Sequence, residues 1–227
     1  MKLSTKKQIK DFKKILEKKE LQFDFNNSIY IDYEFVKFDS PYLATIKTQN
    51  FTSTYFFEKD WVSFKEKYSF KLNNTKFICF SNFLFLLKNL KIHENQFFIS
   101  WSMADCKVTE THFVKLPWLN LKSLAKSDVS KHFIHKKKKY LKQDGFGKIK
   151  NNHKLEVYEK IYGIKREDKG KAIFSTSKRK LDKILKLDKV TKQDVQLFKK
   201  TLENLASYNR NDVESIYQIA LNIQQRI

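Results

Sequence analysis

The sequence predicts a β-sheet covered by helices, which is an α/β or α+β fold. Its first half contains several short runs of branched and aromatic residues, the composition typical of strands. Later segments alternate such runs with stretches of helical periodicity. A chain of 227 residues with 21 Phe can bury a substantial core. We therefore expect one domain with embellishments, or one domain with a small appendage.

Strands dominate the first half of this domain. The run Ser28–Phe35 is the clearest, because five of its residues are Ile, Tyr or Phe. A short apolar run at Phe77–Phe80 precedes a segment with the pattern of a buried helix. The elements expected in this half are strands at 28–36, 42–49, 52–57 and 96–102 and helices at 58–68 and 82–90.

Helices dominate the second half. A helix is expected to begin within Trp118–Ala125, and periodic apolar positions continue to the end of the chain. Further helices are expected at 155–162, 178–187, 192–206 and 211–226.

Residues 1–27 form a separate N-terminal region in this prediction. Ile9, Phe12 and Leu16 make an apolar stripe, and lysines cover the rest of a basic amphipathic helix at 3–20. Such a helix either docks on the core with a solvated lysine face or touches nucleic acid or a membrane surface.

The formal net charge of +21 points to a polyanionic partner. Between residues 131 and 200 there are 23 Lys and Arg against 8 Asp and Glu, so most of the excess lies there. An acidic membrane surface would be attracted by the same charge. However, the sequence has no apolar stretch of 18 residues and no hydrophobic signal sequence, and its two cysteines make no disulfide framework. We expect a soluble, cytoplasmic protein with no membrane partner.

Two carboxylates lie on the first predicted strand. Side chains on a strand alternate between faces, so Asp32 and Glu34 point the same way, about 7 Å apart. Two acids on an otherwise apolar strand are costly to desolvate, and a divalent cation is the usual compensation. The alternative is a half-exposed strand whose polar face meets water. The opposite face would be filled by Ile29, Ile31, Tyr33 and Phe35.

A third acid lies near the C-terminus. Tyr208 and Asp212 are four residues apart, so they share one face of a helix. Val213 and Ile216 can pack that helix inward and bring Asp212 close to the sheet. Considered alone, Asp212 is better explained as a helix-start acid that the helix dipole favours.

Together, these motifs resemble those of the DnaQ-like, or DEDD, 3′–5′ exonuclease superfamily. The pattern is Asp-x-Glu on the first core strand, an Asp after a later strand, and Tyr-x-x-x-Asp on a late helix, the arrangement of the DEDDy branch. Phe97–Asp105 is similar to the strand that leads to the second motif of that superfamily. Lys154–Arg166 is similar to the segment before the third motif, so the resemblance spans about residues 28–222.

The resemblance implies an α/β fold with an RNase H-like mixed β-sheet flanked by α-helices. The exonuclease domain would cover residues 28–227, with a basic helical insertion at 131–150 before the last motif. Asp105 would be the second-motif acid, although the common Asn before it is missing. Asp60 and Asp128 are rival candidates.

The implied chemistry is phosphodiester hydrolysis with two divalent ions, Mg²⁺ or Mn²⁺. Asp32 would bridge both ions, while Glu34 and Asp212 would hold the ion that carries the attacking water. Asp105 would support the second ion. Tyr208 would orient the water or help to deprotonate it.

The implied partner is nucleic acid, with single-stranded or frayed 3′ ends of DNA or RNA as substrate. Basic residues would hold the phosphates, and an aromatic ring could stack on a terminal base. The predicted contact residues are Phe35, Lys136, Lys137, Lys138, Lys139 and Arg166. Core packing is the alternative for Phe35, and a solvated loop is the alternative for the lysine run. A non-catalytic nucleic-acid-binding protein on the same fold and an RNase H-like endonuclease are the alternative functions.

Overall fold

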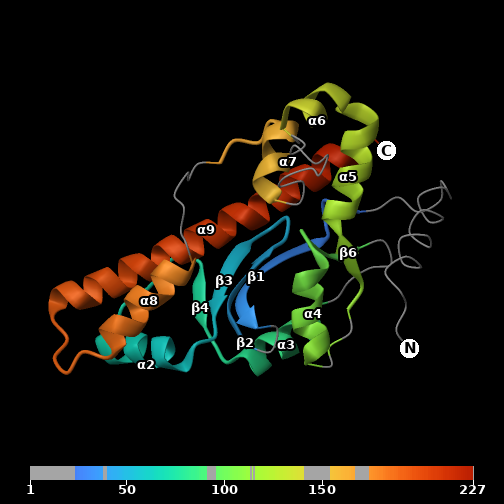
Figure 1. Ribbon diagram of the computed structural model, residues 1–227. Helices are drawn as coiled ribbons and strands as arrows, with labels where there is room; N and C mark the ends of the chain where they lie inside the picture. The colour runs from blue at the N-terminus through green and yellow to red at the C-terminus, as the bar shows by residue number, and fades with distance from the viewer. Residues whose placement is uncertain are drawn as a thin grey trace.

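The computed structural model describes residues 24–37, 40–90, 96–112, 114, 116–140, 154–166 and 174–226 (Figure 1). Within these residues a six-stranded mixed sheet has the order β4-β3-β2-β1-β5-β6. Helices flank the sheet, which confirms the α/β class. The helix predicted at 3–20 lies outside the described residues. The strands are β1 (Ile29–Lys37), β2 (Ser40–Lys47), β3 (Thr52–Phe56), β4 (Thr75–Phe77), β5 (Phe98–Ser100) and β6 (Trp118–Asn120).

Strand β1 lies at the centre of the sheet, between an antiparallel and a parallel neighbour. It pairs antiparallel with β2, which pairs antiparallel with β3. On its other side β5 runs parallel to it, in a register that joins Ile29 and Tyr30 to Phe98 and Ile99. Strand β5 ends at Ser100, so the C-terminal half of β1 faces the beginning of the next helix. The carboxyl ends of parallel strands are a common place for ligands in open α/β sheets.

Helices cover both faces of the sheet. Helix α9 crosses one face, with α8 alongside its N-terminal half and α5 and α7 near its C-terminal half (Figure 1). Helices α3 and α4 contribute to the apolar cluster on the opposite face. The helices are α2 (Lys59–Tyr68), α3 (Phe80–Asn89), α4 (Met103–Thr111), α5 (Leu121–His132), α6 (Ile134–Tyr140), α7 (Leu155–Tyr162), α8 (Phe174–Leu185) and α9 (Lys192–Gln224).

Helix α9 is one continuous helix of 33 residues, where the sequence predicted two helices at 192–206 and 211–226. It begins with a capping box in which Thr191 and Asp194 satisfy each other's backbone N–H groups. The intervening Ser207–Arg210 contains neither Gly nor Pro, so nothing in the backbone interrupts the helix. Tyr208 and Asp212 therefore lie in the middle of a continuous helix, and Asp212 is not at a helix start.

Two shorter elements also differ from the prediction. Trp118–Asn120 was expected to begin a helix but forms β6, because it pairs in parallel with β5. Helix α5 starts directly after it, and the side chain of Asn120 caps it by accepting from the N–H of Ser123. The strand expected at 96–102 is shorter, and Asp105 lies in the first turn of α4, not at a strand end.

A buried network joins the C-terminal end of α9 to α5 and α7. The carboxylate of Asp128 accepts hydrogen bonds from the Tyr162 hydroxyl at 2.7 Å and from the Arg226 guanidinium at 3.2 and 3.0 Å. The same guanidinium lies 4.9 Å from the Phe133 ring centroid. Asp128 is thus fully engaged in holding three helices together.

We predict that Asp128→Ala lowers the free energy of unfolding by roughly 2–4 kcal/mol, because it leaves a partly buried arginine without its carboxylate. Denaturant unfolding followed by circular dichroism measures this change. Asp182→Ala is the matched control: Asp182 also forms an ion pair, with Lys178 at 2.9 Å, but it is 39% exposed. That control should cost less than about 1 kcal/mol. Equal losses in the two variants would contradict the prediction.

Candidate metal centre

Two apolar clusters lie between α9 and the sheet, and a polar band separates them. One cluster packs under the N-terminal half of α9 and the other under its C-terminal half. The band contains Asp32, Thr45 and Thr54, which are paired in register across β1, β2 and β3, together with Asn209 of α9. The Thr45 and Thr54 hydroxyls are 2.9 Å apart and hydrogen-bonded. Buried polar groups of three strands and α9 therefore meet at one place.

Strand β1 divides its side chains between the two faces as its alternation predicts. Ile29, Ile31 and Tyr33 belong to the apolar cluster under α3 and α4, whereas Asp32 and Glu34 face α9. Phe35 also packs against that apolar cluster, across the sheet from the acids. Core packing therefore accounts for part of the ring surface, and stacking of Phe35 on a nucleic-acid base stays a prediction.

Asp212 of α9 lies beside the two acids of β1. One carboxylate oxygen from each of Asp32, Glu34 and Asp212 can be chosen so that all three lie within 4.8 Å of one another. This distance suits three ligands of one divalent ion, and hard carboxylate oxygens suit Mg²⁺ or Mn²⁺. The donor set and its spacing thus fit a metal ion.

Asp105 lies next to this group but takes a different position. It is buried, and its Oδ1 accepts a hydrogen bond of 3.2 Å from the backbone N–H of Tyr33 on the free edge of β1. The Ser102 hydroxyl is 3.5 Å from its Oδ2. Of the rival candidates, Asp60 is exposed in the first turn of α2, and Asp128 holds the helix network described above. Asp105 is therefore the fourth acid near the site.

Asn209 is a site residue that the sequence prediction missed. Its side-chain amide donates a short hydrogen bond to Oδ2 of Asp32, and the residue is completely buried. Its neighbours on the same face of α9, Leu205 and Val213, are apolar core residues. A polar residue at a core position of a periodic helix was the available signal. Asn209 fixes the orientation of Asp32.

Arg166, which was predicted to bind nucleic acid, lies inside the acid group. Its guanidinium contacts Oδ1 of Asp212 through Nη2, and its side chain is 14% exposed. Its Nε is 3.3 Å from the carboxylate of Glu159, a buried acid on α7 that the sequence prediction did not single out. Arg166 therefore neutralises site acids as the structure stands.

The lysine run at 136–139 forms most of α6. The Lys136 ammonium donates to the backbone carbonyl of Ile161 at 3.1 Å and lies 5.4 Å from the Phe133 ring centroid. It thus helps to join α6 to α7. The side chains of Lys137, Lys138 and Lys139 lie outside the described part, as do residues 141–153 of the predicted insertion, so nucleic-acid contact by this run stays a prediction.

Burial and the charges of neighbouring acids raise the pKa values at the site, so its carboxyl groups lose their protons at higher pH than exposed acids do. Burial raises the pKa of Asp32 well above its usual value, and the charges of Asp105 and Glu34 raise it further. Burial, followed by the Asp105 charge, raises the pKa of Glu34 to about 7. Burial raises the pKa of Asp105 to about 6. Burial, followed by the Glu34 charge, also raises the pKa of the Tyr208 phenol, so this hydroxyl keeps its proton at neutral pH.

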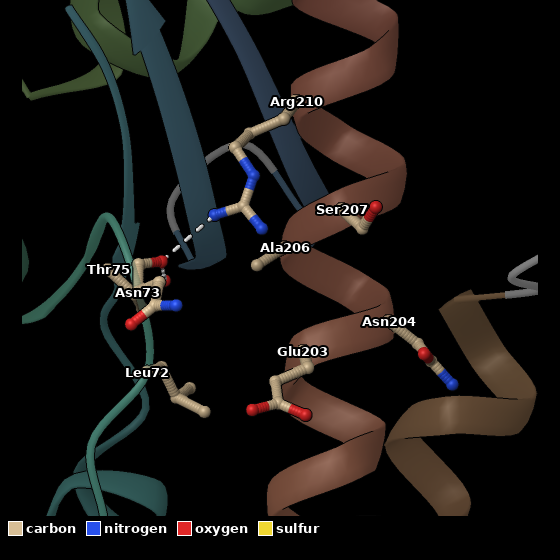
Figure 2. Close-up of a pocket in the computed structure, with 8 residues that line it drawn as sticks. All are labelled: Leu72, Asn73, Thr75, Glu203, Asn204, Ala206, Ser207 and Arg210. Atoms are coloured by element: carbon tan, nitrogen blue, oxygen red, sulfur yellow. Dashed lines mark hydrogen bonds between the residues drawn. The ribbon is translucent and has the colours of Figure 1, made fainter. Parts of the chain in front are cut away.

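The opposite side of α9 contains a separate polar pocket of about 300 Å³ (Figure 2). Arg210 is two residues from Tyr208 and points away from it around the helix. Its guanidinium donates to the carbonyl of Asn73, just before β4, at 3.2 Å. This bond ties the middle of α9 to the edge of the sheet and so helps to fix the rotation of the helix that presents Tyr208 and Asp212.

Comparison with protein-family models, with curated proteins and with solved structures finds no match. In the described part of the chain, none of the helices combines the length and apolar character needed to cross a bilayer.

We predict that the thermal stability of the metal-free protein falls as the pH rises from about 5 to 8. The raised pKa values of Glu34 and Asp105 mean that their protons stabilise the folded state fully below pH 4.5 and 3.8, respectively, and that this stabilisation is lost as the pH rises through about 7 and 6. Differential scanning fluorimetry in chelator measures the melting temperature. Glu34→Gln should show a shallower pH dependence, and a wild-type profile as shallow as that of the variant would contradict the prediction.

We predict that Asn209→Ala weakens Mn²⁺ binding by roughly 10–100-fold, because groups that orient a metal ligand typically have effects of this size. Isothermal titration calorimetry at fixed pH measures the affinity. Asn204→Ala is the control, since Asn204 is exposed on the same helix. Unchanged affinity in Asn209→Ala would show that its hydrogen bond does not organise Asp32 for metal.

Proposed function

We propose that the protein is a metal-dependent 3′–5′ exonuclease that hydrolyses phosphodiester bonds of single-stranded or frayed nucleic acid by a two-metal-ion mechanism. The observation that carries this proposal is the convergence of Asp32 and Glu34 of β1 with Asp212 of α9. These acids are about 180 residues apart in the chain and follow the order of the DEDDy motifs. Tyr208, four residues before Asp212, completes that pattern.

The sheet topology supports the RNase H-like part of the proposal. Three antiparallel strands, β1 to β3, are followed by β5 and β6, which run parallel to β1 and are reached through helical connections. The acids lie on the central strand β1 and on helices at its C-terminal half, where a mixed sheet leaves room for a ligand.

The residues of the site have separable roles. Asp32, Glu34 and Asp212 would hold divalent ions. Asp105, which is hydrogen-bonded to the Tyr33 N–H of β1, would support the second ion directly or through water. Bound Mg²⁺ or Mn²⁺ would activate the attacking water and stabilise the leaving oxygen. Asn209 holds Asp32 in place. The protonated Tyr208 hydroxyl suits the orientation of a water molecule better than removal of its proton.

A non-catalytic nucleic-acid-binding protein is the second candidate function. The observation that favours it is the ion pair between Arg166 and Asp212, because an arginine neutralises part of the acid group without any metal. Such a protein would use the positive charge of the chain to bind phosphates non-specifically.

The proposal predicts that the purified protein shortens 5′-labelled single-stranded DNA or RNA from the 3′ end with Mn²⁺ and not with chelator. Asp32→Ala should lower the rate by roughly 10³-fold, because metal ions supply several kcal/mol of transition-state stabilisation. Gel electrophoresis resolves the products. Asp60→Ala, which removes an exposed acid, is the control and should keep the wild-type rate.

Three other outcomes have distinct meanings. Internal cuts would support an RNase H-like endonuclease, and a gel shift without cleavage would support the non-catalytic protein. An Asp32→Ala variant as active as the wild type would remove the site assignment.

A further inference from the structure

Arg166 connects the metal centre to a second buried acid. Helix α7 ends at Tyr162 and is capped by Gly163, whose φ of 76° turns the chain sharply. Arg166 follows three residues after Gly163. Its guanidinium reaches two carboxylates at once, with Nη2 on Asp212 and Nε 3.3 Å from Glu159. It also lies 5.3 Å from the centroid of the Tyr208 ring. One arginine thus touches a proposed metal ligand, the proposed water-orienting residue and an acid outside the metal group.

The two carboxylate partners of Arg166 differ in what else they can bind. Asp212 belongs to the three acids whose oxygens lie within 4.8 Å of one another, so a divalent ion and Arg166 compete for it. Glu159 is not in that group and is 4% exposed, so it keeps its charge partner whether or not metal is present. A buried carboxylate without a partner would be strongly destabilising. Arg166 therefore has one carboxylate partner that a bound metal ion would take and one that it would not.

We propose that Arg166 is the resident counter-ion of Asp212 in the metal-free protein, and that a divalent ion displaces it while Glu159 retains it at the edge of the site. This inference rests on the metal centre proposed above. After displacement, Nη2 of Arg166 lies beside Tyr208 and has no carboxylate to bind. It is then positioned to donate to a phosphate oxygen, the acceptor that a guanidinium matches best.

Replacement of Arg166 by a metal ion at Asp212 means that the metal binds before the substrate phosphate. Without metal, the Arg166 guanidinium is paired with the Asp212 carboxylate and is not available to bind the substrate phosphate. Metal loading removes that carboxylate from Arg166 and creates the phosphate site at the same moment. Arg166 thus couples ion binding to phosphate binding.

The direct test is a titration of the full-length, ¹⁵N-arginine-labelled protein with Mg²⁺, followed by NMR of the guanidinium signals. Arg166→Met identifies the Arg166 signals by their loss. We expect the Arg166 Nη signals to move with the same midpoint as metal binding, and its Nε signal to move less, because Nε stays beside Glu159. Signals of Arg166 that do not move at saturating Mg²⁺ would overturn the proposal.

Calorimetry with Mn²⁺ gives an independent readout. Arg166→Met should bind Mn²⁺ about tenfold more tightly than the wild type, because one competing positive charge is removed from Asp212. Its metal-free melting temperature should fall, because Asp212 and Glu159 lose their partner. Arg179→Met removes an equal charge from an exposed position on α8 and should change neither quantity. Arg166→Lys keeps the positive charge but loses the planar guanidinium that can contact two carboxylates at once. Its affinity for Mn²⁺ should therefore lie between those of the wild type and Arg166→Met.

The outcomes separate this inference from the proposed function. If Mn²⁺ binds in a way that Asp32→Ala abolishes, but Arg166→Met binds it no more tightly than Arg179→Met does, the metal centre stands and the displacement is wrong. If no Mn²⁺ binds to the wild type, the metal centre itself is wrong and the displacement falls with it.

Discussion

The packing of α9 across the sheet is the constraint on which the rest of the structure depends. The helix buries apolar residues at both of its ends, and these two clusters fix its position on β1, β2 and β3. Because the helix is continuous, its middle cannot move away from the sheet. Asn209 and Asp212 are therefore held against Asp32, although none of these polar groups gains anything from burial by itself. Hydrophobic packing of the two ends of α9 thus holds Asp212, in the middle of the helix, close to the acids of β1.

The structure contains two kinds of buried acid. Asp128 is matched by the hydroxyl of Tyr162 and by both arms of Arg226, so its charge is fully compensated within the fold. The acids around Asp32 are matched only in part: Arg166 contacts Asp212, but burial still raises the pKa values of Asp32, Glu34 and Asp105. A group of carboxylates that the fold brings together but neutralises only in part is suited to a cation from solution.

Arg166 offsets part of the unfavourable free energy of burying these acids close together. Its positive charge lowers the pKa of Asp32 against the effect of burial, and it contacts Asp212 directly. Under the proposed function, stability without metal and activity with metal make opposite demands on Asp212. An arginine anchored on a separate acid, Glu159, can satisfy both demands in turn.

The sequence by itself determined the features that follow from local periodicity. The alternation of β1 placed Asp32 and Glu34 on one face and Ile29, Ile31 and Tyr33 on the other, and the four-residue spacing put Tyr208 and Asp212 on one side of a helix. Only the tertiary structure decided that α9 is continuous, that Trp118–Asn120 is a strand and that Phe35 packs against an apolar cluster. It also decided that Asn209 and Glu159 lie at the site and that Arg166 contacts its acids. These depend on contacts between segments far apart in the chain. Local periodicity fixes which face a side chain takes, but only packing fixes which other segment that face meets.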